Sequence, residues 1–218
     1  MNFKDLFEFL ETLNNNNSKE WMDQNRSWYE QVKADYVLWL EDLDEELSKA
    51  DADYFSLPGK KAINRINNNL LFHPNKPTYK DHIGAGLDKR PQTGDFYIHL
   101  GLEEIFVAGG FYKPKPEFLK SIREAIDYNG DEFKKIINTR SFQKHFGGLM
   151  KDEDQLKTAP KGFSQDHKHI DLLRLKSFAA MKMFTPQEVL SADFKAQVIE
   201  SYQVLLPFRR YLNTAVTV

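Results

Sequence analysis

Apolar residues recur every three or four positions through the first third of the chain, the spacing of a helix with one buried face. This spacing predicts a first helix over residues 3–13 and a second, long helix that continues to about residue 47. A run of asparagines at 14–17 separates them, because short amide side chains compete for backbone hydrogen bonds. Asn17 or Ser18 is expected to cap the second helix. Its aromatic stripe predicts that Trp21, Trp28 and Trp39 are largely buried in the core.

The hydrophobic period changes to two between Asp95 and Leu102, which predicts a half-buried strand. Residues 105–108 follow after two glutamates, so the pair predicts an antiparallel hairpin. Gly109 and Gly110 are expected to break the second strand, allowing a bulge or a close approach of another backbone segment. Further strand patterns lie at residues 62–66, 79–87 and 177–184.

Two prolines, Pro114 and Pro116, open a helical pattern that runs to Ile126, and further helices are expected over 132–138 and 186–212. The chain has no internal repeat and no long linker. It therefore predicts one α+β domain, in which an antiparallel sheet packs against N-terminal and C-terminal helices. Within residues 1–218 we expect a helical acidic segment (1–56), a basic strand-rich segment (57–112) and a third segment of helices with a strand (113–218).

Composition narrows the class of protein. The 218 residues are 41% hydrophobic and 28% charged, which excludes general disorder, and the absence of cysteine excludes a disulfide scaffold and thiolate chemistry. No apolar run approaches the roughly 18 residues of a membrane span, and the first residues do not resemble a signal peptide. We therefore expect a soluble, cytoplasmic protein without a membrane partner.

The net charge of -2 conceals a strong asymmetry along the chain. Residues 1–56 carry a net charge of -9, whereas the two following segments are both basic. No acid lies between Asp53 and Asp81, and none between Asp171 and Glu188. Five cations and a histidine fall in the first window: Lys60, Lys61, Arg65, His73, Lys76 and Lys80. These windows are where an anion would meet least repulsion.

Signatures of known chemistry are absent: there is no phosphate-binding glycine loop, no dinucleotide fingerprint and no serine nucleophile elbow. One cluster resembles a metal site, the Asp166-His167-Lys168-His169 run with Asp171 close behind. Lys168 would repel a cation, and the two histidines lack the i, i+4 spacing that presents ligands on one helix face. We therefore favour a capping or turn role and expect no metal and no cofactor.

Several separated motifs resemble the bacterial and fungal domain of unknown function numbered 2461 over nearly the whole length. They are an Asn-Asn-x-x-Glu-Trp opening (Asn16, Asn17, Glu20, Trp21), a Tyr-Glu pair (Tyr29, Glu30), a Lys-x-x-Tyr-Lys ending (Lys76, Tyr79, Lys80), a glycine turn before proline (Gly109, Gly110, Pro114) and a stretch from Pro160-Lys161-Gly162-Phe163 to Arg174-x-Lys176. The family name implies no activity.

One departure from the family pattern concerns charge. Where relatives read Arg-Asp-x-Arg-Phe, this chain has Asn68, Asn69, Leu70, Leu71 and Phe72. Two cations and a carboxylate are thus replaced by neutral residues. If that charged group serves a ligand in relatives, we expect this protein to fold normally but to be inactive or altered in ligand.

The first functional hypothesis is a binding protein or enzyme with a basic pocket for a phosphorylated or carboxylated small molecule. Its candidate anion-binding residues are Arg65, Lys76, Tyr79, Lys80, Gly109, Gly110, Lys161, Arg174 and Lys176, with the glycines supplying backbone amides. His167 is the candidate acid–base group. An alternative interpretation of the same cations is that they pair with the acidic N-terminal helices.

Two other classes of function stay open at this point. One is a non-enzymatic protein-interaction module, which needs no catalytic signature. The other is nucleic-acid binding through basic residues interleaved with Tyr79, Phe111 and Tyr112, against which the net charge argues.

Overall fold

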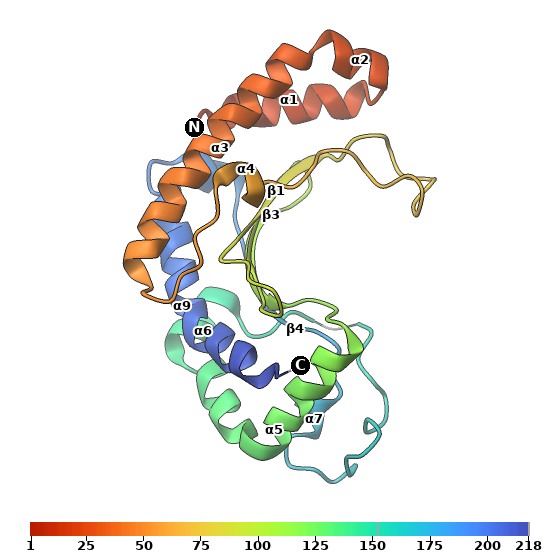
Figure 1. Cartoon of the computed structure of the whole chain (residues 1–218), viewed down its shortest axis with the longest axis vertical. Helices are drawn as coiled ribbons and strands as arrows, with labels where there is room; N and C mark the ends of the chain where they lie inside the picture. Colours follow the sequence, from red (N-terminus) through yellow and green to blue (C-terminus); the bar gives the residue numbers. More distant parts are fainter. Residues whose placement is uncertain (152, 218) are drawn as a thin grey trace. The chain divides into compact units, whose positions relative to one another are not determined.

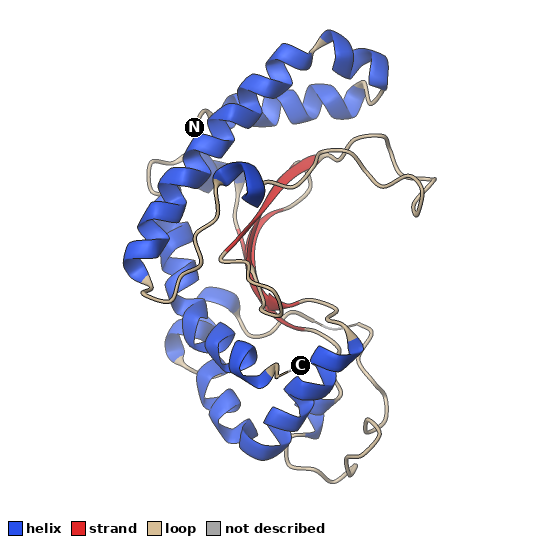
Figure 2. Ribbon diagram, in the orientation of Figure 1, coloured by secondary structure: helices blue, strands red, loops and turns tan. Residues whose placement is uncertain are grey.

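The computed structural model describes residues 1–151 and 153–217 and confirms an α+β fold (Figure 1, Figure 2). Half of it is helical, and four strands form one antiparallel sheet in the order β1-β2-β3-β4. The strands are β1 (His82–Leu87), β2 (Phe96–Gly101), β3 (Ile105–Phe111) and β4 (Phe178–Met183). The helices are α1 (Phe3–Asn15), α2 (Lys19–Gln24), α3 (Arg26–Ala50), α4 (Gly59–Ala62), α5 (Pro116–Ile137), α6 (Arg140–Phe146), α7 (Ile170–Leu173), α8 (Pro186–Leu190) and α9 (Phe194–Ala215). Within the described residues, no helix combines the length and apolar character needed to cross a membrane.

The fold is consistent with the expected single α+β domain, and its contacts gather into two compact units. The first unit comprises Met1–Asp88, Tyr97–Val107 and Met183–Ile199. The second comprises Lys89–Phe96, Ala108–Lys182 and Glu200–Val218.

Aromatic packing holds the helices of the first unit together. Figure 1 shows α1 folded back along the first part of α3. Phe9 of α1 meets Trp28 edge-on at a centroid distance of 5.3 Å, and Trp39 stacks on Phe194 at 5.8 Å. Trp39 is 8% exposed, whereas Trp21 and Trp28 are only partly buried, because they lie toward the end of the helical hairpin and retain solvent on one side.

The predicted long second helix is interrupted. Ser18 caps α2 by accepting a hydrogen bond from the Trp21 N–H at 3.1 Å, as expected. The chain then leaves helical geometry at Asn25, whose side-chain amide donates to the Trp21 carbonyl at 2.9 Å. This bond adds to the one from the Asn25 backbone N–H to the same carbonyl at 3.0 Å and caps the end of α2, so the pattern divides into α2 and α3.

The segment between α4 and β1 forms a two-stranded excursion, which we call the arm (residues 63–81; yellow in Figure 1). The strand expected at 62–66 is not formed. Of its residues, only Ile63 makes an isolated antiparallel bridge, to Ala85, and a second bridge joins Asn67, just beyond this range, to Tyr79. Asn17 anchors the arm with two hydrogen bonds, accepting from the Tyr79 N–H at 2.9 Å and donating to the Tyr79 carbonyl at 3.0 Å.

The second unit is built around α5, α9 and β4. Phe133 packs edge-on against Phe178 at a centroid distance of 6.0 Å and in a tilted arrangement against Phe208 at 5.8 Å. The two predicted helices after Pro116 are one element with a kink at Asn129, and the predicted helix over 186–212 is instead α8 and α9, separated at residues 191–193. The strand expected at 177–184 is confirmed as β4.

Candidate functional site

The first unit gathers three of the predicted anion-binding cations, Arg65, Lys76 and Lys80, which we call the cation cluster. The Lys80 ammonium donates a hydrogen bond to the Arg65 carbonyl at 2.7 Å, because the arm pairs residues 64–68 with residues 78–84. Burial lowers the pKa of Lys80, and the positive charges of Arg65 and Lys76 lower it further. Lys80 therefore lies within electrostatic reach of two other cations of the arm.

The cation cluster has no acidic partner among residues 1–151 and 153–217: no ion pair joins a carboxylate to Arg65, Lys76 or Lys80. The sequence alternative, in which these cations neutralise the acidic N-terminal helices, thus finds no ion pair to support it. Like charges held together without counter-charges favour an external anion.

Tyr79, the fourth predicted residue of this group, is 4% exposed. The Asn17 side chain hydrogen-bonds to the backbone N–H and carbonyl of Tyr79 and so anchors the arm. The Tyr79 side chain packs in the core of the first unit, so we leave Tyr79 out of the ligand-contacting set.

Two histidines lie beside the cation cluster, on the half-buried face of the sheet. His82 Nδ1 is 2.8 Å from the Asp81 carboxylate, and the ring of His82 lies 4.1 Å from that of His99 between centroids. His99 also stacks on Phe106 at 4.6 Å, and its Nδ1 is 3.3 Å from the Tyr97 hydroxyl. Because a carboxylate only accepts hydrogen bonds, Nδ1 of His82 carries the proton and Nε2 holds a lone pair.

A small depression of about 180 Å³ opens at these histidines; we call it the histidine pocket. Its lining is Asp81, His82, His99, Gly101, Leu102, Glu103 and Glu104. Gly101 shapes it, because a Cβ there would come within 2.8 Å of His99 Nε2 and 3.0 Å of the His82 Cβ. Gly84 likewise makes room for Tyr97, because the Tyr97 hydroxyl occupies the space that a Cβ on Gly84 would fill.

His99 is neutral at neutral pH. Burial lowers its pKa from 6.5 to about 4, and the neighbouring charges of His82 and Lys80 act in the same direction, against Asp81. Because the charge of Lys80 lowers the pKa of His99, the Lys80 ammonium lies within electrostatic reach of the pocket. The site thus combines a proton acceptor, a neutral imidazole and a nearby cation.

The depressed pKa of His99 predicts acid lability. The unfolded chain takes up a proton near pH 6.5 and the folded chain only near pH 4, so the free energy of unfolding falls as the pH drops through this window. Because His99 is partly exposed, we expect a loss of about 1–2 kcal/mol, measured by urea unfolding at pH 7 and pH 4.5. His99→Gln should flatten the pH profile. His73→Gln, at an exposed site, should leave it unchanged. An equal slope in all three proteins would contradict the assignment.

The other predicted site residues lie in the second unit. Gly109 and Gly110 are buried within β3, so they do not offer the exposed amides that the sequence indicated. A Cβ on Gly109 would come within 3.0 Å of Leu205, and one on Gly110 would overlap the Phe178 carbonyl. The glycines serve close packing here.

The remaining three predicted cations of the second unit have different environments. Lys161 is exposed, and Arg174 is half-buried with no hydrogen-bond partner for its Nε among the described residues. The charge of Lys176 lowers the pKa of Asp154, after the larger effect of the Lys113 ion pair at 3.0 Å. Whether any of them binds the same anion as the cation cluster stays a prediction.

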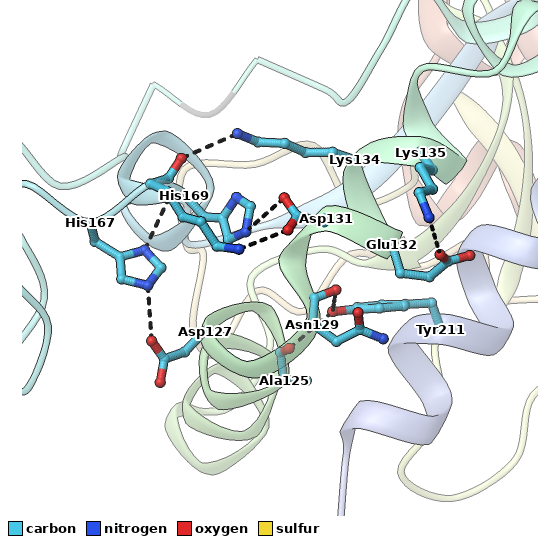
Figure 3. Close-up of polar contacts among 11 residues, drawn as sticks. Ala125, Asp127, Asn129, Asp131, Glu132, Lys134, Lys135, His167, His169 and Tyr211 are labelled. Carbon is cyan, nitrogen blue, oxygen red and sulfur yellow. Dashed lines mark hydrogen bonds and ion pairs between the residues drawn. The ribbon is translucent and has the colours of Figure 1, made fainter.

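The histidine run of the second unit is engaged by its own protein neighbours (Figure 3). His167 Nε2 lies 2.9 Å from Asp127, and its Nδ1 accepts the His169 N–H at 3.0 Å. Lys168 pairs with Asp131 at 2.7 Å. Both ring nitrogens of His167 are therefore occupied, which leaves this candidate acid–base group no free lone pair.

The second histidine of the run is fully packed. His169 is 1% exposed, and burial lowers its pKa. Gly130 on α5 lies against its ring so closely that a Cβ would overlap it. Among the described residues, no group of three or more histidine or carboxylate side chains is arranged to hold a metal ion. The arrangement ties the segment before α7 to α5.

Sequence reasoning missed Asp81, His82 and His99, although signals for them existed. The alternating pattern of 95–102 already assigned Tyr97 and His99 to the face opposite Phe96 and Ile98. The pairing of β1 with β2, which brings His82 to His99, has no counterpart in the local pattern.

Comparison with family models matches residues 5–211 to the family described as conserved hypothetical protein (DUF2461). The match confirms the resemblance found in the sequence motifs. No curated protein and no solved structure matched the chain.

Proposed function

The chain belongs to this DUF2461 family, whose description names no activity, and from the geometry of the first unit we propose that the protein binds an anionic small molecule at the cation cluster. The observation that carries the proposal is the set of three neighbouring cations without acidic partners, one of them partly removed from water. A phosphate or carboxylate group would supply the missing counter-charge and restore the ordinary pKa of Lys80.

The scale of the cluster fits a small ligand better than a nucleic acid. Two of the three aromatic residues considered for base stacking, Tyr79 and Phe111, are 4% and 6% exposed, and only Tyr112 is open to solvent. Stacking on bases requires exposed ring faces. Three cations also match the charge of one or two anionic groups.

Lys80→Met tests this proposal. Calorimetric titration with pyrophosphate and with citrate should show that the native chain binds at least one of them, and that the variant binds at least tenfold more weakly, because a charge-assisted hydrogen bond is worth about 1.5–3 kcal/mol. Lys4→Met, at an exposed position of α1, is the matched control and should bind like the native chain. Equal affinity of Lys80→Met and native protein would refute the cluster as the binding site, as would a native chain that binds neither anion.

The tip of the arm favours a second candidate, a protein-interaction module. Leu71 and Phe72 are 84% and 72% exposed there, next to the half-exposed Leu70. Leu71→Ser with Phe72→Ser should leave anion affinity unchanged if the tip serves a separate contact. If the double variant loses anion binding, the tip belongs to the ligand site instead.

A further inference from the structure

We propose that the histidine pocket is a catalytic site in which His82 removes a proton from a carbon next to the carbonyl group of an anionic ligand. The inference rests on the proposed anion binding at the cation cluster and adds the reaction class to it. It is built from Asp81, His82, His99 and Lys80, all in the first unit.

His82 is prepared as a base by its neighbour. The Asp81 carboxylate accepts the Nδ1 proton at 2.8 Å, which fixes the tautomer, leaves the lone pair on Nε2 and stabilises the imidazolium formed when Nε2 takes up a proton. His82 has 24% of its side chain exposed, and it lines the pocket, so a small molecule can reach it. In contrast to His167, no protein group occupies its second nitrogen among the described residues.

His99 supplies the complementary group. The Tyr97 hydroxyl lies 3.3 Å from Nδ1 of His99, and in the proposed site it donates to this nitrogen, so that the neutral ring keeps its proton on Nε2, at the side where Gly101 leaves room. That N–H can donate to a carbonyl oxygen as negative charge develops on it. The low pKa of His99 keeps the ring neutral, so it acts as a donor without competing with His82 for the proton.

The charges around the pocket orient an anionic ligand. Glu103 and Glu104 line one part of the pocket, while Lys80 lies within electrostatic reach of His99. An anionic group is therefore repelled from the glutamates and drawn toward the cation cluster. This leaves the neutral carbonyl part of the ligand in the histidine pocket, against the His82 and His99 rings, which contact each other.

The reaction balances without any further reactant. The C–H bond breaks and its proton moves to His82 Nε2, while the electron pair of that bond forms a carbon–carbon double bond and the carbonyl pair moves onto oxygen. The resulting enolate is stabilised by the His99 N–H and by the charge of Lys80. Return of the proton to the same carbon gives the starting compound, and its addition to oxygen gives the enol tautomer; where the neighbouring carbon carries a hydroxyl group, the enediol formed in this way can be reprotonated at the other carbon to give the isomeric carbonyl compound. The substrate class is therefore a small carboxylated or phosphorylated carbonyl compound that can enolise.

Deuterium exchange tests this inference. In D₂O, the native protein should accelerate the incorporation of deuterium next to the carbonyl of 2-oxobutyrate or of dihydroxyacetone phosphate, observed by proton NMR; the two probes separate carboxylate from phosphate recognition. His82→Gln should slow the exchange at least 100-fold, the range of a lost general base, while the affinity for the probe stays within about twofold. His73→Gln is the control and should exchange like the native chain.

Nitrogen NMR supplies a readout that is independent of substrate. The ¹⁵N shifts of His82 should show a protonated Nδ1 and an unprotonated Nε2, and Asp81→Asn should disturb this tautomer and slow exchange about tenfold. If a probe binds in a Lys80-dependent manner but no exchange exceeds that of free imidazole, the anion site stands and the catalytic inference is overturned. If neither probe binds, the proposed function fails and this inference fails with it.

Discussion

Replacing Gly110 by alanine is expected to destabilise the second unit by about 3 kcal/mol or more. Gly110 lies in β3 with φ at +112°, a conformation that residues with a Cβ rarely adopt. A Cβ there would overlap the carbonyl oxygen of Phe178 on the neighbouring strand and lie 2.9 Å from the Phe208 ring. Backbone and a fully buried ring cannot move aside cheaply, so the overlap adds to the dihedral cost.

Gly148→Ala separates the two costs. Gly148 has a similar φ of +125°, but the nearest side-chain atom to a Cβ there is 4.0 Å away. This control should lose only the dihedral cost, about 1–2 kcal/mol. Urea unfolding of both variants measures the difference. Equal destabilisation would show that the packing of β3 against β4 is looser than described.

Asp44→Ala should cost about 2–4 kcal/mol. This carboxylate on α3 is 7% exposed and accepts hydrogen bonds from the Tyr54 hydroxyl at 2.5 Å, from the Ser56 hydroxyl and from the Leu57 N–H at 3.3 Å. These bonds hold the segment that leads from α3 to α4 and the arm. Alanine would leave the donors without this acceptor in a partly buried environment.

The matched control for Asp44 lies on the same helix. Asp42 pairs with Lys195 at 2.7 Å, and 55% of the Asp42 side chain is exposed. Asp42→Ala should therefore cost less than about 1 kcal/mol, since exposed ion pairs contribute little. In thermal unfolding, the midpoint temperature of Asp44→Ala should lie far below that of Asp42→Ala. A reversed order would contradict the anchoring role of Asp44.

The local spacing of hydrophobic residues was enough to predict most of the helices and strands. The 3.6-residue spacing located α1 and α3, and strict alternation located β2 with Phe96 and Ile98 inward. What it could not foresee were interruptions set by single side chains, such as Asn25 between α2 and α3. It also assigned a strand to residues 62–66, which meet the neighbouring strand at only one bridge.

The candidate site likewise has features that the sequence could indicate and features that it could not. The acid-free window before Asp81 and the family-like motif drew attention to Lys76 and Lys80, because a lack of nearby acids can be seen in the sequence itself; their binding of an anion stays a prediction. The sequence did not indicate that the Tyr79 side chain is buried or that its backbone bonds to Asn17, 62 residues earlier. The His82–His99 contact arises from strand pairing, which a local pattern does not encode.

The family departure at the arm is accommodated structurally. Asn68 donates its side-chain amide to the Pro77 carbonyl at 2.8 Å, while Leu71 is exposed. An arginine at position 71 would thus remain in water, so restoring the charged residues of relatives should not disturb the core. The expectation that their loss alters the ligand stays a prediction.

The most direct test of the account is an NMR titration of the Lys80 side chain, with ¹³C-labelled lysine and the signal assigned by its loss in Lys80→Met. In the free protein, the pKa of Lys80 should lie below the ordinary lysine value of 10.5, because burial and two neighbouring cations disfavour the ammonium form. Saturating pyrophosphate or citrate should raise the Lys80 pKa. A Lys80 pKa at the ordinary lysine value, or one that does not move with either anion, would contradict anion binding at the cation cluster.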